Sequence, residues 1–273
     1  MNTMKSTLLL AAMTGLMLFV GQAVGGRSGI TIAFVIAAVT NFAAWFWSDK
    51  IVLASYRAQP VGAQEAPELY AIVESLANRT GIPMPRLYVI PDPALNAFAT
   101  GRSPSHAAVA ATEGILRALD RDELEGVLAH ELSHVINRDT LTSSVAATLA
   151  GAISWLAHMA YFMPVGRDRD EGPNPLVALL TIILAPFAAM LIRLAVSRSR
   201  EYEADASGAR LVGHPEGLAS ALRKLQAAAE RIPMRAADPA TAHLFIVNPL
   251  SGRSLAGLFS THPPLEKRIE RLM

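Results

Sequence analysis

The residues with the clearest chemical potential are His130-Glu131-Leu132-Ser133-His134, which follow the pattern H-E-x-x-H. Residues four apart on a helix return to nearly the same face, so both imidazoles can reach one metal ion. Zinc accepts neutral imidazole at this spacing. Glu131 can take a proton from a metal-bound water, because the ion lowers the pKa of that water. The pattern therefore predicts two metal ligands and a general base that later protonates a leaving amine.

The same five residues can also occur by chance, as two histidines on an ordinary helix. The surrounding sequence favours the metal site. Asp120 and Glu123 have the spacing of a capping box, which predicts a helix from Asp120 to about Arg138. Asn137 and Asp139, just after the motif, are expected to be helix-end caps rather than ligands. Apolar residues flank the motif, as expected for a helix packed in a core: Val127, Leu128 and Ile136.

A catalytic zinc site needs a third protein ligand and an open fourth position. The chain has no cysteine, so the third ligand must come from His, Asp or Glu. The run Arg200-Glu201-Tyr202-Glu203-Ala204-Asp205 offers Glu201 and Asp205 on one helix face. One of these carboxylates can bind the metal while the other braces a ligand imidazole. Glu203 points elsewhere on that helix and is expected to pair with a nearby arginine.

The composition predicts membrane segments. The chain of 273 residues is 52% hydrophobic and only 17% charged, with a mean hydropathy of +0.32, whereas soluble domains contain about 25% charged residues. The net charge of +1 argues against a broad nucleic-acid surface. Four apolar stretches approach the roughly 20 residues that a helix needs to cross a bilayer: Thr7–Val24, Ile30–Trp47, Ser143–Met163 and Leu176–Val196.

Two alternatives remain for these stretches. The first could be a cleavable signal peptide, although the second apolar stretch follows so soon that a helical hairpin suits it better. The third and fourth could be buried helices of a soluble core. Basic residues favour the cytoplasm for 49–142 and for the tail 197–273, with hairpins at 1–48 and 143–196. Those expected inside are Lys5, Lys50, Arg57, Arg138, Arg198 and Arg200, and those expected outside are Arg27, Arg167 and Arg169.

The parts between the apolar stretches predict a mainly α fold with a small β-sheet (α+β) on a four-span helical membrane base. Before the motif we expect a helix at Ala66–Thr80 and short strands at Arg86–Ile90, Asn96–Thr100 and His106–Thr112. In the tail we expect helices at Glu201–Val212, Pro215–Ile232 and Pro263–Leu272. The last helix has Leu265, Ile269 and Leu272 on one side and charged residues on the other.

Five short sequence motifs, or words, make the chain resemble the HtpX-type membrane zinc metalloproteases, which are relatives of the CAAX prenyl endoproteases. The words run in family order across nearly the whole chain, so together they are far more specific than the zinc pattern alone. They are Leu95–Gly101 (LNAFATG), His130–His134 (HELSH), Ser199–Ala206 (SREYEADA), Asn248–Gly252 (NPLSG) and Thr261–Leu265 (THPPL).

The resemblance implies a zincin-like peptidase site with one Zn²⁺ per chain, held by His130, His134 and Glu201. Asp205 would then be the carboxylate that supports a ligand imidazole. Asn96 and His262 resemble groups that steady the substrate carbonyl or its oxyanion. The plainer alternatives are a turn residue at Asn96 and a helix-start residue at His262.

The resemblance also implies a multi-pass protein of the cell (inner) membrane whose site faces the cytoplasm. Family substrates are misfolded or damaged membrane proteins, cut in quality control. We expect an unfolded polypeptide to pair with an exposed strand at His106–Thr112 through main-chain hydrogen bonds. The alternatives are an inactive membrane zinc-binding protein or sensor, a transporter or scaffold with a chance motif, and a soluble peptidase. Nothing in the sequence predicts the oligomeric state.

Overall fold

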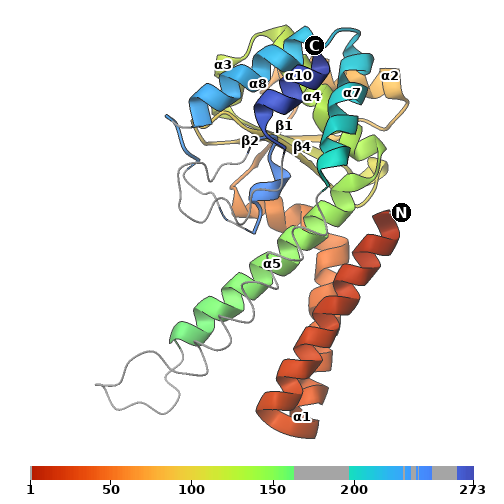
Figure 1. Cartoon of the computed structure of the whole chain (residues 1–273), viewed down its shortest axis with the longest axis vertical. Coiled ribbons are helices and arrows are strands. Elements are labelled where there is room, and N and C mark those ends of the chain that lie inside the picture. Colours follow the sequence, from red (N-terminus) through yellow and green to blue (C-terminus); the bar gives the residue numbers. More distant parts are fainter. Residues whose placement is uncertain (1, 163–196, 230, 235–237, 239, 248–262) are drawn as a thin grey trace.

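The computed structural model describes residues 2–162, 197–229, 231–234, 238, 240–247 and 263–273. A part built around a small sheet lies at one end, and the helices α1 (Asn2–Ser55) and α5 (Asp139–Phe162) project from it as a stalk (Figure 1). The N-terminus returns to the sheet-containing end of the stalk. This arrangement confirms a mainly helical protein with a small mixed sheet.

Helix α1 is a hairpin of two antiparallel arms. The chain reverses at Gly26, whose φ of 56° and ψ of −135° suit a residue without a side chain. The arms touch closely, since a Cβ at Gly21 would lie 2.5 Å from the carbonyl oxygen of Gly29. The side-chain amide of Asn41 donates across the pair to Thr14 Oγ1 at 2.8 Å. Small residues and an internal polar contact therefore hold the hairpin together, as is common for helices in lipid.

The two arms account for the first two predicted spans. The segments Met4–Gln22 and Gly25–Ser55 are the described helices long and apolar enough to cross a membrane. The third apolar stretch forms most of α5, which packs along α1 through Val145, Leu149 and Ile153. The fourth stretch lies outside the described residues. The membrane hairpin is thus supported for the first two stretches, and the four-span base stays a prediction.

The sheet contains four strands in the order β1-β2-β4-β3. They are β1 (Gln59–Val61), β2 (Arg86–Ile90), β3 (Ala97–Thr100) and β4 (Ala108–Thr112). β4 pairs parallel with β2 and antiparallel with β3, and β1 pairs antiparallel with β2. The expectation that an exposed strand at His106–Thr112 receives the substrate is wrong, because both edges of β4 are occupied. β3 is the edge strand on that side.

Helices cover both faces of the sheet, and the residues of its strand β4 are small. Along β4, Val109 and Ala111 face the core formed with α2 (Pro67–Thr80) and α4 (Arg121–Ile136). Ala108 and Ala110 face the opposite side, where they meet Val52 and Leu53 at the end of α1 and Phe98 of β3. Alternate residues of β4 therefore pack on opposite faces of the sheet. The end of the apolar hairpin α1 packs against one of these faces.

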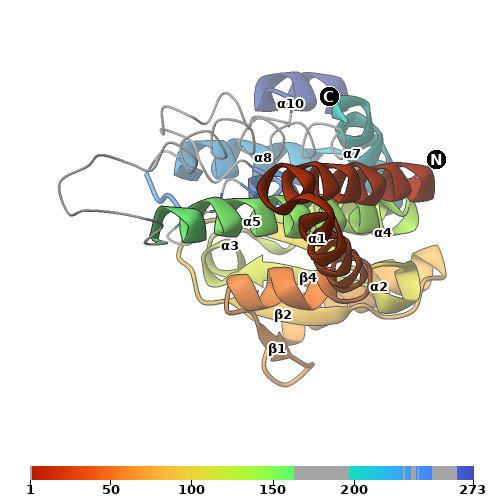
Figure 2. The same cartoon turned by 90° about the horizontal axis from the view of Figure 1, so that it is seen from below.

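Helix α4, which carries the H-E-x-x-H pattern, lies in the centre. Its predicted start is confirmed: Asp120 accepts from the Glu123 amide at 3.0 Å, and the Glu123 side chain accepts from the Asp120 amide at 3.0 Å. The other helices in the described residues are α3 (Glu113–Ala118), α7 (Arg198–Val212), α8 (Glu216–Ala229) and α10 (Leu265–Leu272), with single 3-10 turns at Pro104–His106 and Ala242–Leu244. Figure 2 shows α7, α8 and α10 on the same side of α4.

Glycines let two helices approach α4 at backbone distance. A Cβ at Gly208 of α7 would lie 2.9 Å from the amide nitrogen of His130. A Cβ at Gly126 of α4 would lie 2.6 Å from the amide nitrogen of Leu218 of α8. The distance between α7 and the motif helix is therefore set by the absence of a side chain at Gly208.

We predict that Gly208→Val separates α7 from α4. Overpacking at a close crossing costs about 2 kcal/mol or more of unfolding free energy, so the thermal unfolding temperature in detergent should fall clearly. The matched control is Ala206→Val, on an exposed position of the same helix, which changes helix propensity without touching α4. Equal unfolding temperatures for the two variants would contradict the close crossing.

Candidate metal centre

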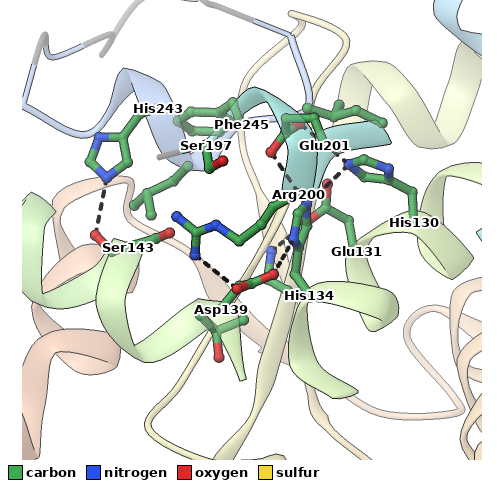
Figure 3. A pocket seen from close by; sticks show the side chains of 14 residues that line it. His130, Glu131, His134, Asp139, Ser143, Ser197, Arg200, Glu201, His243 and Phe245 are labelled. Atoms are coloured by element: carbon green, nitrogen blue, oxygen red, sulfur yellow. Dashed lines mark hydrogen bonds and ion pairs between the residues drawn. The ribbon is translucent and has the colours of Figure 1, made fainter. Parts of the chain in front are cut away.

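Three predicted side chains meet at one point. His130 and His134 project from α4, and Glu201 projects from the first turn of α7; their donor atoms all lie within 4.8 Å of one another (Figure 3). The two Nε2 atoms are 3.3 Å apart. Glu201 Oε2 lies 3.8 Å from His130 Nε2, and Oε1 lies 3.6 Å from His134 Nε2. One ion placed among these atoms would have two imidazoles and a carboxylate as ligands, which is the donor set of many catalytic zinc sites.

Asp205, one helical turn after Glu201, takes a different position. Its Oδ1 lies 2.9 Å from Nδ1 of His130, on the side of the ring that faces away from Glu201. Sequence spacing left open which of the two carboxylates would bind metal. The geometry favours Glu201 as the ligand and Asp205 as the group that orients the imidazole, since a carboxylate on Nδ1 fixes the tautomer and leaves Nε2 for the metal.

His134 has a supporting carboxylate of its own. Asp139 Oδ2 lies 3.4 Å from His134 Nδ1, and Asp139 Oδ1 accepts from Arg200 at 2.8 Å (Figure 3). The sequence interpretation of Asp139 as only a helix-end cap is therefore incomplete. It begins α5, and its side chain reaches back to the motif. The five-residue separation crosses a break between two helices, so helical spacing gave no signal for this contact.

Arg268 of α10 is the other functional side chain that the sequence analysis missed. It is 0% exposed and donates to both oxygens of Asp205, from Nε at 2.9 Å and from NH2 at 2.7 Å. Its NH1 donates to the carbonyl of Ile246 at 3.0 Å. The expectation that the charges of this helix lie opposite its apolar side is wrong for Arg268. A signal was present, because Arg268 is three residues after Leu265 and four before Leu272, within the apolar stripe.

Glu131 lies within the same buried group, as required of a general base. It is 2% exposed, and its Oε2 accepts from the amide of Ala99 in β3 at 2.9 Å. Burial raises the pKa of Glu131 to about 8; the charge of His134 opposes this shift and the charge of Glu201 adds to it. A carboxylate with so high a pKa can hold a proton near neutral pH, which suits a group that takes and then returns one.

The pKa values of the two imidazoles are shifted in opposite directions. Burial, with the charge of Arg268, lowers the pKa of His130 to about 4. Burial alone would also lower the pKa of His134, but the hydrogen bond to Asp139 and the charge of Glu201 outweigh it and raise that pKa to about 9. His130 is therefore neutral and ready to donate a lone pair, whereas His134 lies in a strongly negative environment.

The donor set fits a divalent cation. Four buried carboxylates (Glu131, Asp139, Glu201 and Asp205) face two guanidinium groups (Arg200 and Arg268). With all four carboxylates ionised and both imidazoles neutral, which is the state that can bind a cation, two formal negative charges are in excess. A buried site with uncompensated charge is costly, and one doubly charged cation would balance it.

An open pocket lies beside these residues. The segment His243–Ile246 forms its opposite wall. Ile246 donates from its amide to the carbonyl of Ala97 at 3.2 Å, so this segment lies along the outer edge of β3. Phe245 is fully buried and packs against Tyr56 and Phe98. The pocket thus lies between the candidate metal ligands and a wall that the tail supplies.

Asn96 is not among the described residues that line this pocket. The side-chain amide of Asn96 donates to the carbonyl of Val247 at 2.8 Å, and its oxygen accepts from the Ala97 amide at 3.2 Å. Asn96 therefore holds the tail segment on the sheet edge, and its contact with substrate stays a prediction. His262 lies outside the described residues.

A family model described as Peptidase family M48 matches residues 63–273. The chain belongs to this family. Proteins named "Protease HtpX homolog" are 56% identical over 276 residues in Desulfatibacillum aliphaticivorans, covering 99% of this chain and 89% of that protein, and 57% identical over 274 residues in Syntrophobacter fumaroxidans, covering 98% and 97%. The Pyrococcus furiosus relative of that name is 55% identical over 272 residues, covering 98% and 94%.

The resemblance to HtpX-type proteases is confirmed, and this M48 protein is a metalloprotease. The two apolar arms of α1 agree with a membrane protein. The crystal structure of Ste24p from S. mikatae aligns with 100% of this chain and 65% of its own, at 21% identity and a TM-score of 0.48.

We predict that Asp139→Ala weakens metal binding. Loss of a carboxylate that orients a ligand imidazole typically lowers metal affinity by about 10–100-fold. Competition with a chromophoric chelator would measure the change in the purified protein. Asp122→Ala is the matched control, because Asp122 is exposed on α4, the helix that carries His134. Unchanged affinity in Asp139→Ala would contradict the assigned contact.

Proposed function

We propose that this M48 protein is a zinc-dependent endopeptidase of the membrane, with His130, His134 and Glu201 as zinc ligands and Glu131 as general base. The observation that carries the proposal is the convergence of the three donor side chains within 4.8 Å, from two helices far apart in sequence. Zinc held there would supply Lewis-acid polarisation of a carbonyl and a water of lowered pKa. One ion per chain accounts for the donor set.

Glu131 moves the proton in this mechanism. Its carboxylate accepts a proton from the attacking water and returns it to the amine of the leaving segment. The amide of Ala99 fixes one oxygen, Oε2, at 2.9 Å, so the other oxygen is available on the pocket side. Return of that proton to the amine nitrogen allows the C–N bond to break and restores the Glu131 carboxylate. No covalent intermediate is required, and the chain contains no cysteine nucleophile.

The substrate binds in extended form beside β3 rather than β4, at the Ala99 end of the strand, past the point where Ile246 covers the edge at Ala97. In the antiparallel pair, Ala99 lies opposite Val109, and its amide points outward to Glu131 instead of to β4. Because N–H and C=O of one residue point the same way in such a ladder, the carbonyl of Ala99 also faces the outer edge. Strand pairing there recognises the main chain of the substrate more than its side chains, so the peptidase accepts a broad range of sequences. Asn96 and His262 steady the scissile carbonyl or its oxyanion.

The natural substrates are misfolded or damaged membrane proteins and other unfolded polypeptides. The catalytic residues lie in two cytoplasmic parts, 49–142 and 197–273, that follow the membrane hairpins 1–48 and 143–196. The relatives' name as HtpX homologues and the attachment of the sheet directly to the apolar hairpin support this assignment.

Three variants test the function. Glu131→Gln should retain the metal yet lose about 10²–10⁴-fold of its casein-cleaving activity, because only the proton acceptor is removed. Glu201→Ala should lose the metal, measured by elemental analysis of detergent-purified protein. Glu203→Ala, at an exposed position on the same helix, is the control and should retain both metal and activity.

The outcomes separate the proposal from its rival. Full activity in Glu131→Gln would exclude Glu131 as the general base, and a wild type that binds metal but cleaves no casein would favour the inactive zinc-binding protein. Equal metal content in Glu201→Ala and Glu203→Ala would reject the ligand assignment itself.

The membrane orientation has a direct test because the chain has no native cysteine. Ser28→Cys lies in the exposed turn between the arms of α1, and Ser105→Cys lies at an exposed position beside the sheet. In intact cells, a membrane-impermeant maleimide should label only Ser28→Cys, and it should label Ser105→Cys after lysis. Labelling of Ser105→Cys in intact cells would reverse the orientation, and release of the protein by carbonate would argue for a soluble peptidase.

A further inference from the structure

We propose that Arg268 is a positioning residue of the metal centre: by fixing Asp205 it sets the orientation of His130, so that docking of the C-terminal helix α10 becomes part of metal binding. The inference rests on the proposed metal centre and extends it to a helix that contributes no ligand. Its basis is one continuous chain of contacts, from α10 through α7 to the motif helix α4, beside a direct approach of Arg268 Nη2 to both ring nitrogens of His130 at 3.4 Å.

The first contact joins Arg268 to Asp205 through two hydrogen bonds. Nε and NH2 of Arg268 bind the two oxygens of Asp205 at 2.9 and 2.7 Å. This parallel pairing holds the plane of the carboxylate as well as its position, because a guanidinium is rigid and planar. A lysine could supply the charge but not the second prong. Arg268 therefore restricts the rotation of Asp205.

The second contact passes that restriction to the ligand. Asp205 Oδ1, which Arg268 holds, is also the atom that lies 2.9 Å from His130 Nδ1. With Nδ1–H donating to this oxygen, the lone pair of the ring lies on Nε2, the atom that faces His134 and Glu201. A carboxylate free to turn would allow the ring to turn with it.

Burial indicates that the arrangement has a purpose beyond holding α10. Arg268 is 0% exposed, and removing a guanidinium from water is costly unless every partner is in place. Apolar contacts of Leu265, Ile269 and Leu272 already attach α10 to the core. The neighbouring Arg271 stays at the periphery, stacked 3.8 Å over the ring of Tyr202. Arg268, unlike Arg271, points inward. Its third nitrogen, Nη1, donates to the carbonyl of Ile246 beside the pocket.

The test compares zinc affinity in detergent-purified protein, measured by chelator competition. Arg268→Met should lower the affinity by about 10–100-fold, and Arg268→Lys should recover part of it because the charge remains. Arg271→Met, the control on the same helix, should stay within about twofold of the wild type. Thermal unfolding of each variant reports any general loss of structure separately from affinity.

A double-mutant cycle distinguishes positioning from a merely structural role. If Arg268 acts through Asp205, then Arg268→Met should add little to the affinity already lost in Asp205→Asn. Full additivity, or unchanged affinity in Arg268→Met, would overturn the proposal. If Arg268→Met does not fold, the same cycle with Arg268→Lys gives the answer by the same criterion. A wild type that binds no zinc would instead refute the proposed function.

Discussion

The close crossing of α4 and α7 is the constraint on which the rest of the structure depends. The helix with two histidines and the helix with Glu201 lie almost backbone to backbone, and this brings the three donor side chains within 4.8 Å of one another. Gly208 makes this possible, since even one added methyl group there would meet the amide of His130. The sheet, α8 and α10 pack around this pair and keep the crossing in place.

Around the crossing, charge is arranged in matched pairs. Each ligand histidine has a carboxylate on its Nδ1 side, and each of these carboxylates has an arginine behind it: Asp205 with Arg268, and Asp139 with Arg200. The arginines come from α10 and α7, so parts of the tail brace a motif that lies before the third apolar stretch. Among the described residues, no arginine pairs with Glu131, and the backbone amide of Ala99 donates to it, which leaves it the carboxylate most able to change its proton.

Local sequence rules predicted those features that depend on neighbours along the chain. The capping pair at Asp120 and Glu123 gave the start of α4, and the strands at 86–90 and 97–100 followed from apolar runs ended by proline and glycine. The three donor side chains were found from motif spacing and resemblance. The order of strands was not predictable in this way, because nothing local to residues 108–112 reveals that β2 and β3 cover both edges. Arg268 was misplaced because charge was weighed above its position in the apolar stripe.

The second arm of α1 has a mechanical consequence. It continues as one helix from Gly25 to Ser55, about 46 Å at 1.5 Å per residue, whereas the hydrocarbon layer of a bilayer is about 30 Å thick. Its final turns do not end in a flexible tether; Val52, Leu53 and Tyr56 are buried beneath the sheet. With this arm in the bilayer, the rigid helix would hold the pocket at a fixed distance from the lipid surface. Such a protease has a short working radius: a polypeptide must bend down to the pocket to be cut, and one that stays further from the bilayer is out of reach.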